Sequence, residues 1–293
     1  MNAHKRIEVT ARDLEIFRLM ARHRYVPSTY IYEFVGGASE TRFKERLGNF
    51  FHEGYLDRPE RQWEMANCRY RPVVHEIGAG ARRILEERGI VEEPRTWFSA
   101  SANRQFSHSL MTCEVLASIE LGTRQRPGMR FIPWPEILAK APAETRALST
   151  PFRFPPTASS TAVVPDGLFG IEYRLGGTKA YRFFALEADR ATMPVMRSNQ
   201  NQTSYLGKVA AYREIIAKQV HKLHLGVPNL LVLTVTTSKA RTTDIIGRLK
   251  GQAGGNVAYL FKTVDASDLA APAIRLLFDP WERAGLAPLR IDE

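Results

Sequence analysis

Cysteine is scarce in this chain, and its scarcity excludes two classes of protein. Only Cys68 and Cys113 occur among 293 residues, and no CxxC spacing is found. A disulfide framework or a cysteine-rich zinc site needs more cysteines at closer spacing. Neither is therefore expected.

Long apolar runs and nucleotide-binding loops are also missing. No apolar run approaches the roughly 20 residues of a membrane-spanning helix. The basic segment 1–6 is followed by amphipathic sequence rather than by the apolar centre of a signal peptide. No Gly-Lys-Ser/Thr follows the glycines of 251–255, and no nucleophile elbow occurs. We expect a cytoplasmic protein with no membrane partner.

Positive charge is abundant. The chain carries 41 Lys and Arg against 31 Asp and Glu, a net charge of +10, and its pI is near 9.7. Such a balance favours a polyanionic partner, because Lys and Arg release condensed counterions when they meet nucleic-acid phosphates. Residues 1–90 hold 16 of these cations and 13 of the acids, so the positive charge is spread over both halves.

The first part of the chain reads as three helices. Thr10 and Asp13 form a capping box that opens the first helix, Pro27-Ser28 opens the second, and Ser39 caps the third. In the third helix the spacing predicts a buried stripe of Phe43, Leu47, Phe50 and Phe51. Strands over 55–58 and 68–74 then flank a polar tip, and a helix over 78–88 closes the unit.

This order is typical of a winged helix-turn-helix domain, here predicted over residues 1–91, whose third helix enters the major groove of duplex DNA. The predicted DNA-binding residues are polar or cationic: Thr41, Arg42, Lys44, Arg46 and Asn49 on the third helix, and Arg58, Arg61 and Arg69 on the wing. A small helical protein-interaction module is the alternative.

A linker is predicted over 92–105, an α/β domain over 106–278, and a C-terminal tail over 279–293. Within the domain, segment 135–160 reads as a surface excursion. The other expected elements are a helix over 108–122, a strand over 129–134, a β-hairpin, a helix over 204–220, a strand over 229–236, a helix over 242–252 and a strand over 257–264. The whole chain is thus α/β (α+β overall), with a mixed central sheet in its second domain.

The hairpin is the feature around which we organise the second domain. Gly176-Gly177 lies between two β-type runs, and both glycines accept the positive φ of a tight turn. A loop centred on this pair places Asp166 directly opposite Glu187, and Asp189 projects from the same face as Glu187.

Opposed carboxylates in an apolar sheet repel one another unless a cation lies between them. The spacing therefore predicts that Asp166, Glu187 and Asp189 bind Mg²⁺ or Mn²⁺. Two alternatives stay open. Pro-Asp-Gly is also an ordinary turn tripeptide with solvated acids, and an odd-length loop would send Asp166 to the other face.

The order of elements after the linker resembles the restriction-endonuclease-like core, the PD-(D/E)XK superfamily. Pro165-Asp166 matches the second strand of its motif, and Glu187-x-Asp189 matches the third, with Asp189 where the family has lysine. The resemblance implies catalytic roles for Asp166, Glu187 and Asp189. It offers Lys208 and Tyr212, four residues apart on the next helix, as substitutes for the missing lysine, and Glu114 as an acid from the first helix.

Four stretches from both halves of the chain carry a further resemblance: Phe50-x3-Gly54-Tyr55-Leu56, Tyr70-Arg71-Pro72-x4-Ile77-Gly78-Ala79-Gly80-Ala81, Pro165-Asp166 and Leu186-Glu187-Ala188-Asp189-Arg190. With these stretches the chain resembles the replication-relaxation family of bacterial plasmid and mobile-element proteins. The resemblance implies a role in replication or copy-number control.

Three functions follow from these predictions. The first is a double-stranded-DNA-binding accessory protein with a nuclease-like domain, which acts with mobile-element or replication proteins. The second is an active Mg²⁺-dependent DNA endonuclease, and the third is a protein-assembly module with a degenerate nuclease fold. A homodimer stays open.

Overall fold

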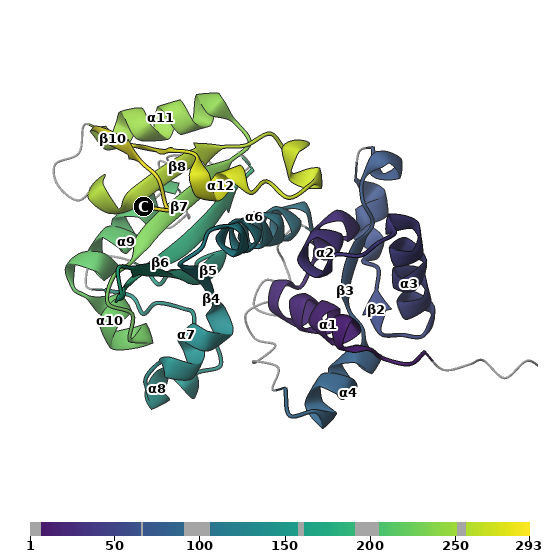
Figure 1. Cartoon of the computed structure of the whole chain (residues 1–293). Coiled ribbons are helices and arrows are strands. Elements are labelled where there is room, and N and C mark those ends of the chain that lie inside the picture. Colours follow the sequence, from purple (N-terminus) through teal and green to yellow (C-terminus); the bar gives the residue numbers. More distant parts are fainter. Residues whose placement is uncertain (1–6, 66, 91–105, 158–160, 191–204, 251–255) are drawn as a thin grey trace, which may run out of the picture. The chain divides into compact units, whose positions relative to one another are not determined.

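The computed structural model describes residues 7–65, 67–90, 106–157, 161–190, 205–250 and 256–293. The chain divides into two compact units (Figure 1). One comprises Met1–Arg95 with Ala270–Pro272, and the other comprises Thr96–Leu269 with Ala273–Glu293. The predicted linker, 92–105, lies outside the described residues.

The N-terminal unit has the expected run of helices followed by a small sheet. Its elements are α1 (Ala11–His23), β1 (Val26–Pro27), α2 (Ser28–Val35), α3 (Glu40–His52), β2 (Leu56–Asp57), the 3₁₀ helices η1 (Glu60–Glu64) and η2 (Cys68–Tyr70), β3 (Val74–Ile77) and α4 (Ala79–Glu87). The strands lie in the order β1-β3-β2, and both pairings are antiparallel.

Local sequence explains where these helices begin. The Thr10 side chain accepts from the Asp13 amide and the Asp13 carboxylate accepts from the Thr10 amide, so the capping box is confirmed. Ser39 caps α3 in the expected way. Phe17 stacks on Tyr55 and meets Phe50 edge-on, which fixes α1 against α3. The predicted burial of Phe51 is wrong, because its side chain is 36% exposed and lies under Arg58.

The wing, here residues 58–73, differs from the prediction. The strand expected over 68–74 is displaced to Val74–Ile77, and 3₁₀ helices form the tip instead. The cause is Gln62, expected at the polar tip but buried: its side chain accepts from the Val74 amide and donates to the Val74 carbonyl. This side chain takes the place of a pairing strand.

The second unit is built on a seven-stranded mixed sheet in the order β10-β9-β8-β7-β6-β5-β4. Strands β6, β7 and β8 are parallel, and the other neighbours are antiparallel. The strands are β4 (Met129–Pro133), β5 (Gly167–Leu175), β6 (Thr178–Asp189), β7 (Leu231–Thr236), β8 (Tyr259–Thr263), β9 (Trp281–Arg283) and β10 (Leu286–Leu289). The helices are α6 (Phe106–Gln125), α7 (Trp134–Lys140), α8 (Ala143–Arg146), α9 (Tyr205–Ala217), α10 (Val220–Leu225), α11 (Lys239–Lys250), η3 (Asn256–Ala258), η4 (Asp268–Ala270) and α12 (Arg275–Phe278).

Hydrophobic cores lie on both faces of this sheet. Residues of α6 and α12 pack with Phe184, Leu186 and Ala188 on one face. Residues of α7, α9 and α11 pack with Ala185 and Val232 on the other. Alternation along β6 therefore turns Glu187 and Asp189 toward α9 and α11. The predicted α/β class with a mixed sheet is confirmed.

Two predicted irregular segments are structured. The surface excursion over 135–160 contains α7 and α8, and its Ile137, Phe152 and Phe154 belong to the core. The predicted tail over 279–293 contributes β9 and β10, with Trp281 fully buried. Among the described residues, no helix is both long enough and apolar enough to span a bilayer.

Candidate functional site

The β5–β6 hairpin has the register that its Gly-Gly turn predicts. Leu175 pairs with Thr178 across Gly176 and Gly177, whose φ angles are 55° and 88°. The ladder runs down to Gly167 opposite Leu186. Asp166 directly precedes β5, and its amide donates to the Leu186 carbonyl at 2.9 Å. The predicted pairing of Asp166 with Glu187 lies beyond the end of this ladder and stays a prediction.

Glu187 is held by two residues of α9. Lys208 Nζ lies 2.5 Å from Glu187 Oε2, and the Tyr212 hydroxyl donates to Oε1 at 2.7 Å. The structure thus brings together two side chains that the sequence offered as substitutes for the missing motif lysine. Burial raises the pKa of Glu187, Lys208 opposes that rise, and Asp166 adds to it. The Tyr212 pKa is raised by burial and by Glu187, so its hydroxyl stays a donor.

Asp166 is buried directly before the first residue of β5, and its carboxylate contacts helix α6. Its Oδ2 accepts from the Ala188 amide at 2.9 Å and lies 3.1 Å from His108 Nε2 on α6. Sequence reasoning did not single out His108 as a functional residue, since nothing in the local pattern distinguishes it. Glu114, the predicted acid of this helix, is buried on α6, and its catalytic role stays a prediction.

Asp189 forms an ion pair with Arg241 of α11, and both side chains are nearly buried. Sequence reasoning missed Arg241 because it lies 52 residues from Asp189. Among the described residues, no group of three or more His, Cys, Asp or Glu side chains is arranged to hold a metal ion. Lys208 and Arg241 offset the charge of Glu187 and Asp189 from within the protein. The predicted metal site stays a prediction.

Most of the predicted DNA-binding residues of α3 are exposed. Thr41, Arg42, Lys44 and Asn49 face outward, and Lys44 also forms an exposed pair with Glu40. Arg46 differs: its guanidinium binds Asp13 of α1 at 2.6 Å and stacks on Phe50. It connects α1 to α3 instead of facing outward.

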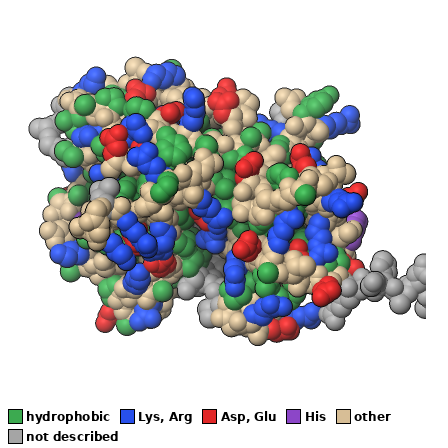
Figure 2. All heavy atoms as spheres, viewed as in Figure 1, with side chains coloured by type: hydrophobic (Ala, Val, Ile, Leu, Met, Phe, Trp, Pro, Cys, Tyr) green, Lys and Arg blue, Asp and Glu red, His purple; other side chains and the backbone are tan. Residues whose placement is uncertain are grey.

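The wing residues also separate into two groups. Arg61 and Arg69 are exposed, whereas Arg58 is half-buried over the Phe51 ring. On the face drawn in Figure 2, Lys and Arg side chains are scattered over both units among Asp and Glu. This scatter agrees with the even spread of charge along the sequence.

Comparison with known proteins identifies the family. A family model described as replication-relaxation matches residues 17–231, from α1 to the start of β7. The comparisons with curated proteins and with solved structures gave no match. Because the family model covers well over half of the chain, this protein belongs to the replication-relaxation family.

Proposed function

We propose that this protein is a DNA-binding accessory factor in the replication or processing of a plasmid or mobile element. In this proposal the N-terminal unit is a winged helix-turn-helix that places α3 in the major groove. The C-terminal unit is a nuclease-like domain that binds or positions the substrate without cutting it. Family membership supports the process, and the N-terminal unit supports DNA as the partner.

The observation that carries the proposal is the exposure of cationic and amide side chains on α3. Phe43, Leu47 and Phe50 are buried against the rest of the unit, which leaves Arg42, Lys44 and Asn49 exposed on one helix. Arginine and lysine pair with phosphates or guanine, and asparagine pairs with adenine. The helix therefore offers groups for both backbone and base contacts.

Hydrogen exchange on the full chain tests this proposal. Adding a random-sequence duplex at low salt should slow exchange of amides in α3 and in the wing, since non-specific binding uses the same surface. The exposed segment of α4, around Arg83, serves as the internal control. Protection confined to other elements, with none in α3, would contradict the assignment.

A metal-dependent endonuclease is the second candidate, and one observation favours it. Lys208 Nζ lies 2.5 Å from Glu187 Oε2. Helix α9 thus places a cation beside the motif carboxylate, whereas β6 has Asp189 at the position where the motif has lysine. This candidate requires Asp166, Glu187 and Asp189 to converge on Mg²⁺ or Mn²⁺, whose chemistry would generate hydroxide, although the described residues include no such metal-holding group.

This candidate function is tested separately. Cleavage of duplex DNA should require Mg²⁺ or Mn²⁺ and should be lost in Asp166→Ala and in Lys208→Met. The same metals should also raise the Tm of the wild type through binding to the folded state. If the wild type shows neither cleavage nor a rise in Tm, the metal-site hypothesis is wrong.

A further inference from the structure

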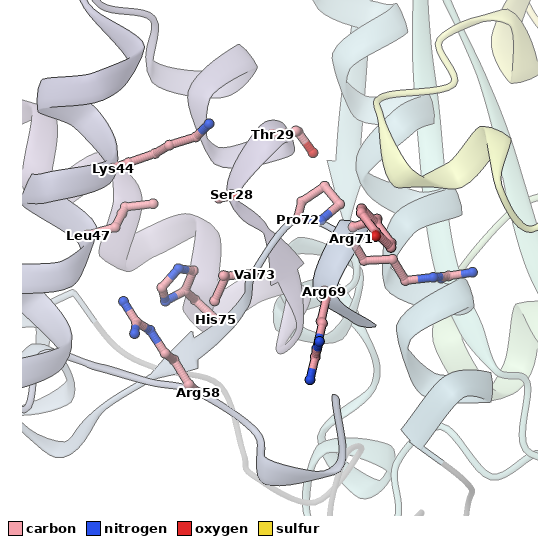
Figure 3. Close-up of a pocket in the computed structure, with 11 residues that line it drawn as sticks. Ser28, Thr29, Lys44, Leu47, Arg58, Arg69, Arg71, Pro72, Val73 and His75 are labelled. Atoms are coloured by element: carbon pink, nitrogen blue, oxygen red, sulfur yellow. The ribbon is translucent and has the colours of Figure 1, made fainter. Parts of the chain in front are cut away.

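A cavity of about 470 Å³ opens in the N-terminal unit between α3 and the wing (Figure 3). Lys44 and Leu47 contribute one wall, and Arg58 and His75 lie next to one another at one end. Four of the eleven lining residues are Lys or Arg, namely Lys44, Arg58, Arg69 and Arg71, and none is Asp or Glu. The lining is thus cationic, with the charge of Lys44 partly offset by Glu40.

Of the four cations that line the cavity, Arg58 has a buried nitrogen atom without a hydrogen-bond partner among the described residues. Its guanidinium lies 4.4 Å from the centre of the Phe51 ring, and no carboxylate among the described residues pairs with it. Its Nε is buried and has no hydrogen-bond partner among those residues. A buried donor of this kind is usually satisfied by water, an ion or a ligand.

His75 provides a second, independent observation. Its side chain is only 1% exposed, and its Nδ1 has no hydrogen-bond partner within the described part of the chain. Arg58 Nε and His75 Nδ1 thus both lack a hydrogen-bond partner among the described residues, and both residues line this cavity. A ligand rich in acceptor oxygens would satisfy the Arg58 donor and offset the cationic charge.

A phosphate group fits this chemistry. The arginine fork and a lysine ammonium are its usual partners. The apolar side chains of Leu47, Pro72 and Val73 also line the cavity, and they suit the sugar beside a phosphate. With α3 in the major groove, the DNA backbone would pass between α3 and the wing, where the cavity opens.

We infer that this cavity is a phosphate site, filled by one backbone phosphate when DNA is bound and held by Arg58. The source of the phosphate rests on the function proposed above. The presence of a phosphate site does not, because a free phosphate compound would meet the same side chains.

Two measurements on the full chain test the inference. The first is the salt dependence of binding to a random-sequence duplex, for the wild type and for Arg58→Met. Losing one phosphate contact should lower the slope of log K against log salt by about 0.9. Arg83→Met, on exposed α4, is the matched control and should leave the slope unchanged. The second is the Tm of both proteins in inorganic phosphate against chloride at equal ionic strength.

The outcomes separate the site from the function. If the wild type binds DNA and Arg58→Met keeps the full slope, the phosphate site is wrong and the DNA-binding proposal stands. If the wild type does not bind DNA, that proposal fails. In that case, a phosphate-induced rise in Tm that disappears in Arg58→Met would support a site for a free phosphate compound. The absence of any such rise in the wild type would overturn the phosphate site. Arg58→Gln repeats the salt test if Arg58→Met does not fold.

Discussion

Burial of His75 should make the N-terminal unit unstable in acid. Burial, and secondarily the nearby Arg58, lower the pKa of the His75 imidazole from 6.5 to about 3. The imidazole of the unfolded chain is protonated near pH 6.5, whereas that of the folded chain stays neutral. The free energy of unfolding therefore decreases as the pH falls from 6.5 toward 3. Lowering the pH from 8 to 5 takes it about 1.5 units below the pKa of the unfolded imidazole. At about 1.36 kcal/mol per unit, protonation then stabilises the unfolded chain by about 2 kcal/mol.

Urea unfolding at pH 8 and pH 5, in buffers without phosphate, measures this loss. Hydrogen exchange in β3 and α4 should report the transition of the N-terminal unit. His75→Leu cannot titrate, so between these pH values it should lose about 2 kcal/mol less than the wild type. His52→Gln, at an exposed position of α3, should retain the wild-type pH dependence. Equal losses in wild type and His75→Leu would refute the reasoning.

Two further predictions concern stability within each unit. Lys208→Met should lower the free energy of unfolding by about 3 kcal/mol, because it leaves Glu187 buried without its cation. The double variant Glu187→Gln/Lys208→Met should lose less than the sum of the two single changes, and additive losses in urea unfolding would disprove the coupling. Gly78→Ala should destabilise the N-terminal unit by about 1–3 kcal/mol, because a Cβ would lie 2.5 Å from the Gly54 carbonyl oxygen. Gly48→Ala is the matched control, since its Cβ would meet only Arg58 at 3.9 Å and alanine favours a helix by about 0.5–1 kcal/mol; equal stabilities would contradict the steric argument.

Local signals in the sequence predicted those features that depend on neighbouring residues. The capping box at Thr10 needs only four residues, and the hairpin register follows from the positive φ of Gly176 and Gly177. The pairing of Lys208 and Tyr212 with Glu187 was predictable in part, since i and i+4 residues share a helix face.

The remainder depends on how distant elements cross. Arg46 turns to Asp13 because α1 packs against α3, and helix periodicity cannot reveal that crossing. Arg241 reaches Asp189 for the same reason, from a helix that follows the neighbouring parallel strand. The Gln62 side chain bonds the Val74 backbone where a neighbouring strand was expected, and secondary-structure propensities do not predict such a bond. Trp281 joins the core through β9, although its segment is short and rich in turns.

The salt dependence of duplex binding tests the central claim, that α3 contacts DNA through its outward face. The wild type should show a linear fall of log K with log salt, and Arg42→Gln/Lys44→Gln should lower the slope by about 1.8, or about 0.9 for each lost phosphate contact. Arg83→Gln should behave as the wild type. A double variant with unchanged affinity and slope, or a wild type that does not bind duplex DNA at low salt, would contradict the claim.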